Sequence, residues 1–263
     1  MEVIVMTFEL LVSTMYKNTD EVLAMLKKSN VKCNALVVVQ GDEEGYQELK
    51  QGEQSIRIFF SKDRGLSKSR NLAIENANAD YAFVMDDDVI IDTDAFKKLS
   101  ELAHKENIDI VASRFSYENG NSSKPHLNKP FFHNYISASG VCSIEIGFNV
   151  NLIKKNQIKF DERFGLGTNF PSGEEYIFIT DCFKSGLTVK YLPINIGVHP
   201  NETSGMDFYT TPEKVLAKRE MIKRIFTWKS PIFIFLFWLK KFPSVVKFGY
   251  GFQFTKTILL GLK

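Results

Sequence analysis

Short apolar runs alternate with amphipathic stretches along most of the chain. Runs rich in β-branched and aromatic residues predict strands, and apolar residues three or four positions apart predict helices. The expected strands are residues 9–13, 35–40, 55–60, 81–85, 108–113, 141–148, 188–192 and 194–198. The expected helices are residues 19–26 with Thr19 as cap, 68–77, one that follows Thr93, 174–183 and 211–224. This alternation predicts an α/β fold with a mostly parallel central sheet flanked by helices.

The pattern changes beyond His199, where a polar loop and a charged helix lead to an apolar, aromatic run at residues 231–241. This run is too short to span a bilayer, which needs about 20 apolar residues. The lysines around it are Lys229, Lys240, Lys241 and Lys247. We expect a main domain over residues 1–205 and a helical C-terminal extension over residues 206–263 that makes peripheral membrane contact. The alternative is a terminal helix that packs on the core.

Composition excludes several broad classes of protein. The 263 residues are 44% hydrophobic and 24% charged, as in globular domains, and the formal net charge is +2. This near-neutral balance argues against a nucleic-acid binder that depends on a strong positive field. The three cysteines are far apart, and no basic residue precedes the first apolar stretch. We therefore expect reduced thiols and a cytoplasmic protein.

Three adjacent carboxylates follow one of the apolar strands. Asp86, Asp87 and Asp88 come directly after the run that ends at Met85. Their mutual repulsion is costly unless a cation or hydrogen bonds offset it. Ligands of open α/β sheets bind at the carboxyl ends of the strands, and hard oxygen ligands suit magnesium or manganese. The sequence therefore favours a metal and phosphate site here, with a solvated acidic turn as the alternative.

Three weaker signals flank this motif. Residues 65–71 open a helix that carries Arg70, an arrangement suited to an anionic ligand, although ordinary helix starts also carry surface charges. A glycine-bearing loop leads Glu174 and Glu175 into a later helix, where one carboxylate can serve as a general base or both can simply favour the helix dipole. His199 follows an apolar run and can bind a metal through its neutral imidazole, or be a surface or core histidine.

In this order, the motifs resemble family 2 glycosyltransferases with the GT-A fold. The matching segments are Gly-x-Ser-x-x-Arg-Asn at 65–71, Asp-x-Asp at 86–88, Phe-Asp-Glu-x-Phe-Gly at 160–165, Gly-Glu-Glu at 173–175 and the later histidine. The resemblance covers roughly residues 10–199. It implies a Rossmann-like GT-A sheet and a metal-dependent transfer from a nucleoside-diphosphate sugar, with Mn²⁺ or Mg²⁺ as cofactor.

The resemblance also implies roles for individual residues. The metal ligands would be Asp86, Asp88 and His199, with Asp88 the direct carboxylate ligand. The residues that bind the nucleotide-sugar would be Ser13, Thr14, Gln40, Asp42, Arg70, Asp86, Asp87 and Gly147. Glu175 stands where the family commonly has its catalytic aspartate, and Glu174 precedes it. Because glutamate replaces aspartate here, both carboxylates stay candidates for the base.

These roles predict an inverting transfer in which Glu175 deprotonates an acceptor hydroxyl. We expect a UDP-sugar as donor and a surface-polysaccharide or lipid-linked glycan as acceptor, at the cytoplasmic face of the plasma membrane, with no nucleic-acid partner. One alternative is a nucleotidyltransferase that makes an activated sugar and releases pyrophosphate. Another is an inactive module that binds nucleotide or carbohydrate.

Overall fold

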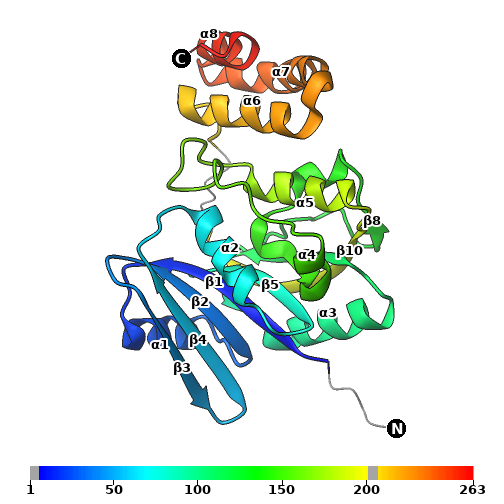
Figure 1. Cartoon of the computed structure of the whole chain (residues 1–263). Helices are drawn as coiled ribbons and strands as arrows, with labels where there is room; N and C mark the ends of the chain where they lie inside the picture. Colours follow the sequence, from blue (N-terminus) through cyan, green and yellow to red (C-terminus); the bar gives the residue numbers. More distant parts are fainter. Residues whose placement is uncertain (1–5, 201–206, 263) are drawn as a thin grey trace. The chain divides into compact units, whose positions relative to one another are not determined.

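A computed structural model of the chain describes residues 6–200 and 207–262 (Figure 1). The chain forms two compact units. Unit 1 comprises Met1–Arg64, Lys68–Lys159 and Ile179–Asn201, and unit 2 comprises Gly65–Ser67, Phe160–Phe178 and Glu202–Lys263. The domain boundary expected between residues 205 and 206 lies outside the described residues and stays a prediction.

Unit 1 is built on a ten-stranded sheet with the order β3-β4-β2-β1-β5-β9-β7-β10-β6, and β8 also pairs with β10. Six strands run in one direction: β1 (Phe8–Met15), β2 (Asn34–Gln40), β4 (Gln54–Ser61), β5 (Tyr81–Asp86), β7 (Ile110–Tyr117) and β10 (Val189–His199). The antiparallel strands are β3 (Gly45–Gln51), β6 (Ile90–Ile91), β8 (Phe131–Phe132) and β9 (Ile146–Asn149). The predicted mostly parallel sheet is thereby confirmed.

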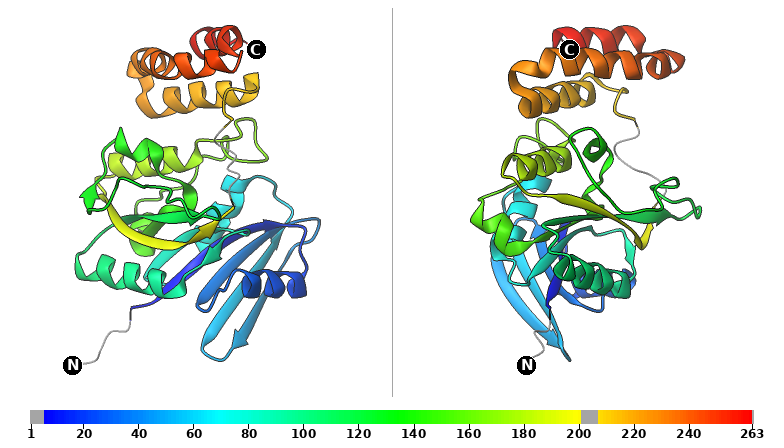
Figure 2. Two further views of the ribbon diagram at one scale, coloured as in Figure 1. Left: turned by 180° about the vertical axis from the view of Figure 1, so that it is seen from behind. Right: turned by 90° about the vertical axis from the view of Figure 1, so that its right-hand side faces the viewer.

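Helices cover both faces of this sheet (Figures 1 and 2). One face carries α1 (Thr19–Lys28) and α3 (Thr93–Lys105), whose apolar residues join a core with Val12, Val37 and Phe83. The opposite face carries α2 (Leu66–Asn76) and α4 (Val150–Lys155) (Figure 1), and successive residues of a strand point to opposite faces of the sheet. Burial on both faces explains why the central strands are nearly continuous apolar runs.

Three expectations about local structure need correction. The first helix is capped by Asn18 rather than Thr19, because Asn18 and Glu21 form a reciprocal capping box. The strand expected over residues 141–148 is confined to β9, since a 3₁₀ turn at Ser143–Glu145 precedes it. Strand β3 was not predicted; its residues are almost all exposed, and its hydrogen bonds are formed with β4.

Unit 2 contains a loop, the start of α5 (Glu174–Lys184) and a group of C-terminal helices. These helices are α6 (Pro212–Phe226), α7 (Ser230–Lys247) and α8 (Gly251–Thr255), followed by a π-helical turn at Lys256–Leu260. Within the described chain, no helix is both long and apolar enough to cross a membrane. The helical C-terminal extension predicted from the sequence is therefore present.

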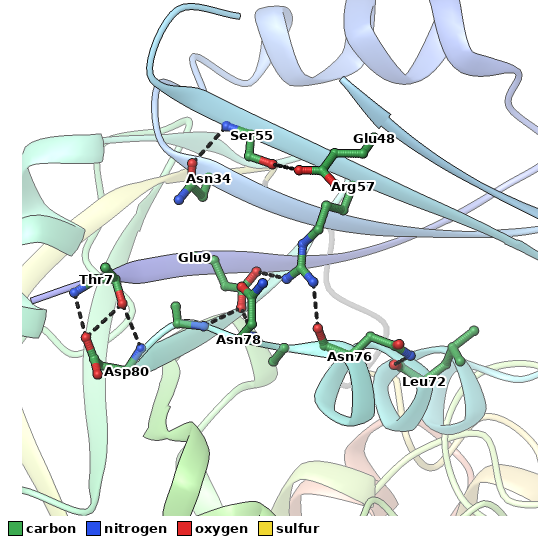
Figure 3. A network of polar contacts seen from close by, with 12 residues as sticks. Thr7, Glu9, Asn34, Glu48, Ser55, Arg57, Leu72, Asn76, Asn78 and Asp80 are labelled. Atoms are coloured by element: carbon green, nitrogen blue, oxygen red, sulfur yellow. Dashed lines mark hydrogen bonds and ion pairs between the residues drawn. The ribbon is translucent and has the colours of Figure 1, made fainter. Parts of the chain in front are cut away.

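A buried ion pair links the start of β1 to β4, and β2 lies between these two strands in the sheet (Figure 3). The Glu9 carboxylate is bonded to the Arg57 guanidinium and accepts the backbone N–H groups of Asn78 (2.6 Å) and Ala79 (3.0 Å). Arg57 also donates to the carbonyl oxygen of Asn76 at 2.7 Å. Only 2% of the Glu9 side chain and 12% of the Arg57 side chain are exposed, so neither charge can be hydrated if its partner is removed.

Replacing Arg57 with methionine is therefore expected to lower the free energy of unfolding by about 3–5 kcal/mol, because the Glu9 carboxylate stays buried without its cation. The double variant Glu9→Gln/Arg57→Met should recover part of this loss, since it removes both charges. Urea unfolding followed by circular dichroism measures both values. A double variant no more stable than Arg57→Met would contradict this account.

Candidate functional site

The carboxyl ends of β1 and β5 lie side by side and bring the first candidate residues together. Ser13 is the register partner of Asp86, and the buried Ser69 hydroxyl donates to the Ser13 hydroxyl at 2.8 Å. Arg70, from α2, is 2% exposed and contacts the Asp86 carboxylate at 3.1 Å. Arg70 therefore stabilises the charge of Asp86, while one third of the Asp86 side chain faces solvent (33%).

Asp87 has partners of its own from the end of β1. The Thr14 hydroxyl donates to its carboxylate, and the Lys17 ammonium forms an ion pair with the same oxygen at 3.2 Å. The Asp87 side chain is 34% exposed. Two of the three adjacent carboxylates thus have a cation from the chain itself, which relieves the repulsion that the sequence implies.

Asp88 is the third carboxylate, and its surroundings differ. Burial raises the pKa of Asp88, and the neighbouring charges of Asp86 and Asp87 raise it further, whereas His199 lowers it. His199 comes from the carboxyl end of β10, so the fold brings it near Asp88 although they are far apart in sequence. The His199 Nδ1 lies 2.8 Å from the carbonyl oxygen of Pro200. Because a carbonyl can only accept, Nδ1 carries a hydrogen, so in the neutral form of the ring it is Nε2 that keeps a lone pair.

The three expected metal ligands are not arranged as a tight cluster. Within residues 6–200 and 207–262, no three His, Cys, Asp or Glu side chains form a group that could hold a metal ion. Asp86 is engaged by Arg70, whereas Asp88 and His199 are close enough to interact electrostatically. The assignment of Asp86, Asp88 and His199 as ligands stays a prediction.

A second cluster lies after β2, at the same edge of the sheet. Gln40 is buried at the end of β2, and its carbonyl oxygen accepts the N–H of Tyr16 at 2.9 Å. Asp42 is exposed and forms an ion pair with Arg64 at 2.7 Å. The Arg64 guanidinium lies 4.7 Å from the centre of the exposed Tyr16 ring. The ends of β1, β2 and β4 thus present an aromatic ring, a cation and a carboxylate together.

Gly147 has a packing role that the sequence did not indicate. It lies in β9, paired with Phe83 of β5 and Val111 of β7. A Cβ atom at this position would stand 2.3 Å from the Phe83 ring, so only glycine fits. The predicted contact of Gly147 with the nucleotide-sugar or the acceptor is a separate matter and stays a prediction.

Glu174 and Glu175 belong to the first turn of α5, in unit 2. Glu174 is 5% exposed and packs against the loop at Gly165, where an added Cβ would lie 3.4 Å from its carboxyl carbon. Glu175 is half-buried, and its Oε2 is buried without a hydrogen-bond partner in the described part of the chain. A buried carboxylate oxygen without an internal hydrogen bond is unusual in a native protein, and a catalytic role is one explanation for it.

The loop before these glutamates is held in place by contacts within unit 2. Asp161 binds Arg163 (2.6 Å) and Arg224 of α6 (2.9 Å), and the hydrogen bonds from Arg163 are the main reason that the pKa of Asp161 is lowered. Gly173 has φ +103°, and a Cβ there would approach the sulfur of Met221 to 2.6 Å. The Gly-Glu-Glu segment therefore requires glycine for both its backbone conformation and its close contact with α6.

Sequence reasoning missed Tyr16, Lys17 and Arg64 at the edge of the sheet. All three follow the ends of predicted strands, and that position was the available signal, since strand ends line the ligand crevice of open α/β sheets. Hydrogen bonds, an ion pair and strand register bring together five of the expected residues there: Ser13, Thr14, Arg70, Asp86 and Asp87.

The fold and this edge of the sheet together define a protein of the GT-A class. Residues 17–170, more than half of the chain, match the family described as Glycosyl transferase family 2. The chain therefore belongs to glycosyltransferase family 2, and the resemblance deduced from the motifs is confirmed.

Solved structures of S. aureus TarS have a similar fold. TarS 1-349 is 17% identical with a TM-score of 0.54, and the match covers 87% of this chain and 78% of that one. The complex of TarS 1-349 with UDP is 18% identical with a TM-score of 0.54, covering 83% and 66%. The complex with UDP-GlcNAc is 17% identical with a TM-score of 0.51, covering 87% and 79%. No curated protein matches the chain.

Proposed function

We propose that this family 2 member is an inverting glycosyltransferase that moves a sugar from a nucleoside-diphosphate sugar to a hydroxyl group of a glycan. The observation that carries the proposal is the acidic end of β5. There Asp86 and Asp87 are paired with Arg70 and Lys17, while Asp88 lies near His199, because β6 and β10 pair at Ile90 and Val198. Such an edge combines carboxylates for a cation with cations for phosphate oxygens.

Asp88 and His199 are the residues best suited to hold a divalent cation, with Asp86 as a further candidate. The Asp88 carboxylate is a hard oxygen donor, and the geometry of His199 leaves its Nε2 lone pair for a ligand. A bound Mn²⁺ or Mg²⁺ would supply positive charge that stabilises the leaving diphosphate. Arg70 and Lys17 add positive charge at the same edge of the sheet. They do so whether they stay paired with Asp86 and Asp87 or exchange these partners when a donor binds.

The second cluster suits the nucleoside part of a donor. The exposed Tyr16 ring offers a stacking surface for a base, and Asp42 offers carboxylate oxygens to ribose or base N–H and O–H groups. Arg64 Nη1 is buried and makes no hydrogen bond to any residue that the structure describes. UDP-GlcNAc, present in one of the TarS complexes, is the donor to test first.

For the chemical step we propose Glu175 as the base that takes the proton of the acceptor hydroxyl. The Glu175 side chain is half-buried, whereas Glu174 is 5% exposed and packs against the Gly165 loop, so Glu175 is the more accessible of the two carboxylates. The acceptor oxygen then attacks the anomeric carbon while the bond to the diphosphate breaks, which inverts the configuration. We further propose a lipid-linked or surface-polysaccharide acceptor, used at the cytoplasmic face of the plasma membrane.

The first test is release of nucleoside diphosphate from UDP-, GDP- and dTDP-sugars with Mn²⁺ or Mg²⁺, with and without EDTA. We expect release from a UDP-sugar, and we expect EDTA to abolish it by removing the cation. Hydrolysis of the donor can be measured without knowing the acceptor. Release of pyrophosphate from a nucleoside triphosphate and a sugar phosphate would instead indicate a nucleotidyltransferase. Neither reaction, together with no cation-dependent nucleotide binding, would indicate an inactive binding module.

A further inference from the structure

Helix α7 has two different faces, and one of them packs against other residues of unit 2. Phe233 stacks on Phe226 with a centroid distance of 3.7 Å, and Phe237 packs edge-on against Phe208 at 5.8 Å. The indole N–H of Trp238 donates to the hydroxyl of Thr255 at 2.9 Å. These residues account for the fixed position of α7 on its neighbours.

The opposite face of α7 is apolar and exposed. Its residues recur every three, four or seven positions, so they form one stripe about 21 Å long at 1.5 Å per residue. The stripe, called here the outer face, consists of Ile232 (61% exposed), Phe235 (51%), Leu236 (50%), Leu239 (55%) and Val246 (47%). Three further exposed aromatic residues lie just before and just after α7: Trp228 (80%), Phe248 (62%) and Phe252 (85%). An exposed apolar stripe of this kind marks a site that binds another protein or a membrane.

The charges around the outer face indicate what that partner is. After Glu220 the sequence contains no aspartate or glutamate, whereas residues 227–263 include six lysines. Lys229, Lys240 and Lys247 are exposed and follow one another at 11 and 7 residues, about three and two helical turns. They therefore line the same flank of the stripe. An apolar face bordered by lysines complements acyl chains below anionic headgroups.

We propose that the outer face of α7 lies in the headgroup boundary of an anionic lipid bilayer, with the helix axis parallel to the membrane plane. The lysine flank would then meet acidic lipid headgroups, and Trp228 and Phe248 would occupy the interface at the two ends. A second copy of the chain fits less well, because paired α7 helices would bring lysine-rich surfaces together without an acidic group from this segment. The inference does not depend on the proposed sugar transfer.

The test is sedimentation of the full chain with vesicles of phosphatidylcholine alone or mixed with phosphatidylglycerol. We expect the chain to bind the mixed vesicles and to be released by salt. Leu236→Asp/Leu239→Asp should weaken binding at least about tenfold, because two apolar side chains are lost from the boundary. Lys240→Glu/Lys247→Glu should weaken binding by about fivefold or more for each lysine removed.

Matched controls come from exposed residues of unit 1. Ile136 is 78% exposed, so Ile136→Asp controls for a lost apolar side chain, and Lys97→Glu/Lys98→Glu on α3 controls for lost charge. Both should bind vesicles as the wild type does. Release of nucleoside diphosphate from a soluble donor, and circular dichroism, should be unchanged in all variants, which separates membrane docking from folding and from the transfer reaction.

Two results would overturn the proposal. One is equal binding of the wild type and Leu236→Asp/Leu239→Asp, or equal binding to neutral and anionic vesicles. The other is a dimer, measured by light scattering, that the same variant converts to a monomer while the wild type binds no vesicles. That outcome would assign the outer face to a second copy of the chain.

Discussion

Asp88→Ala is expected to lower the rate of nucleoside-diphosphate release at least about 1000-fold. Among the three adjacent carboxylates, Asp86 and Asp87 form ion pairs with Arg70 and Lys17, and Asp88 is the one that interacts electrostatically with His199. Removing it would take away the carboxylate best placed to bind the cation. The measurement is the initial rate at saturating donor, with Mn²⁺ varied to test whether higher concentration restores activity.

Asp94→Ala is the matched control, because Asp94 is an exposed carboxylate in the first turn of α3 and contacts none of the candidate site residues in the described structure. Its rate should equal that of the wild type. Cation-dependent activity retained by Asp88→Ala would remove Asp88 from the site, and the role of carboxylate ligand would pass to Asp86.

Glu175→Gln should reduce the same rate by about 100-fold or more while the affinity for donor changes little. Glutamine keeps the shape of the side chain but cannot take a proton from water or from an acceptor hydroxyl. The expected pattern is thus a loss in kcat with a nearly constant dissociation constant, measured by calorimetry with the nucleoside diphosphate. Asp88→Ala should weaken cation-dependent nucleotide binding as well, so the two variants are distinguishable.

Glu174→Gln provides the comparison for the base. Glu174 is buried against the Gly165 loop, so we expect this variant to lower the melting temperature more than the rate. The reverse result, with Glu174→Gln inactive but folded and Glu175→Gln active, would reassign the base to Glu174. This experiment therefore resolves the ambiguity left by the Gly-Glu-Glu segment.

Burial explains which parts of the fold could be predicted from the sequence. Strands β2 and β5 are buried on both faces, and their apolar runs gave nearly correct boundaries. Strand β3 has almost no buried residue, so its sequence lacks the alternation that indicates a strand. The expected strand at 141–148 was too long because buried Glu145 caps a turn by accepting the N–H of Cys142 at 3.0 Å, which hydrophobicity alone does not show.

The candidate site was predicted in its motifs but not in its pairings. The Asp-x-Asp segment and Arg70 were identifiable because residue type and position pointed to a cation at the aspartates and to an anionic ligand at Arg70. The partners Lys17 and Arg64 depend on which strand ends are neighbours, and that order, β4-β2-β1-β5, is a property of the folded sheet. The capping residue Asn18 is different, since Glu21 three positions later already favoured it over Thr19.

The placement of β9 has a consequence for how the chain is synthesised. β5 and β7 are joined through β9, which comes later in the sequence than both of them. While the chain leaves the ribosome, β1, β2, β4 and β5 can pair as soon as each has emerged. Strand β7 has no neighbouring strand to pair with until residues 146–149 of β9 have been synthesised. We expect a nascent chain stopped before residue 146 to protect the first four of these strands from protease while β7 remains cleavable.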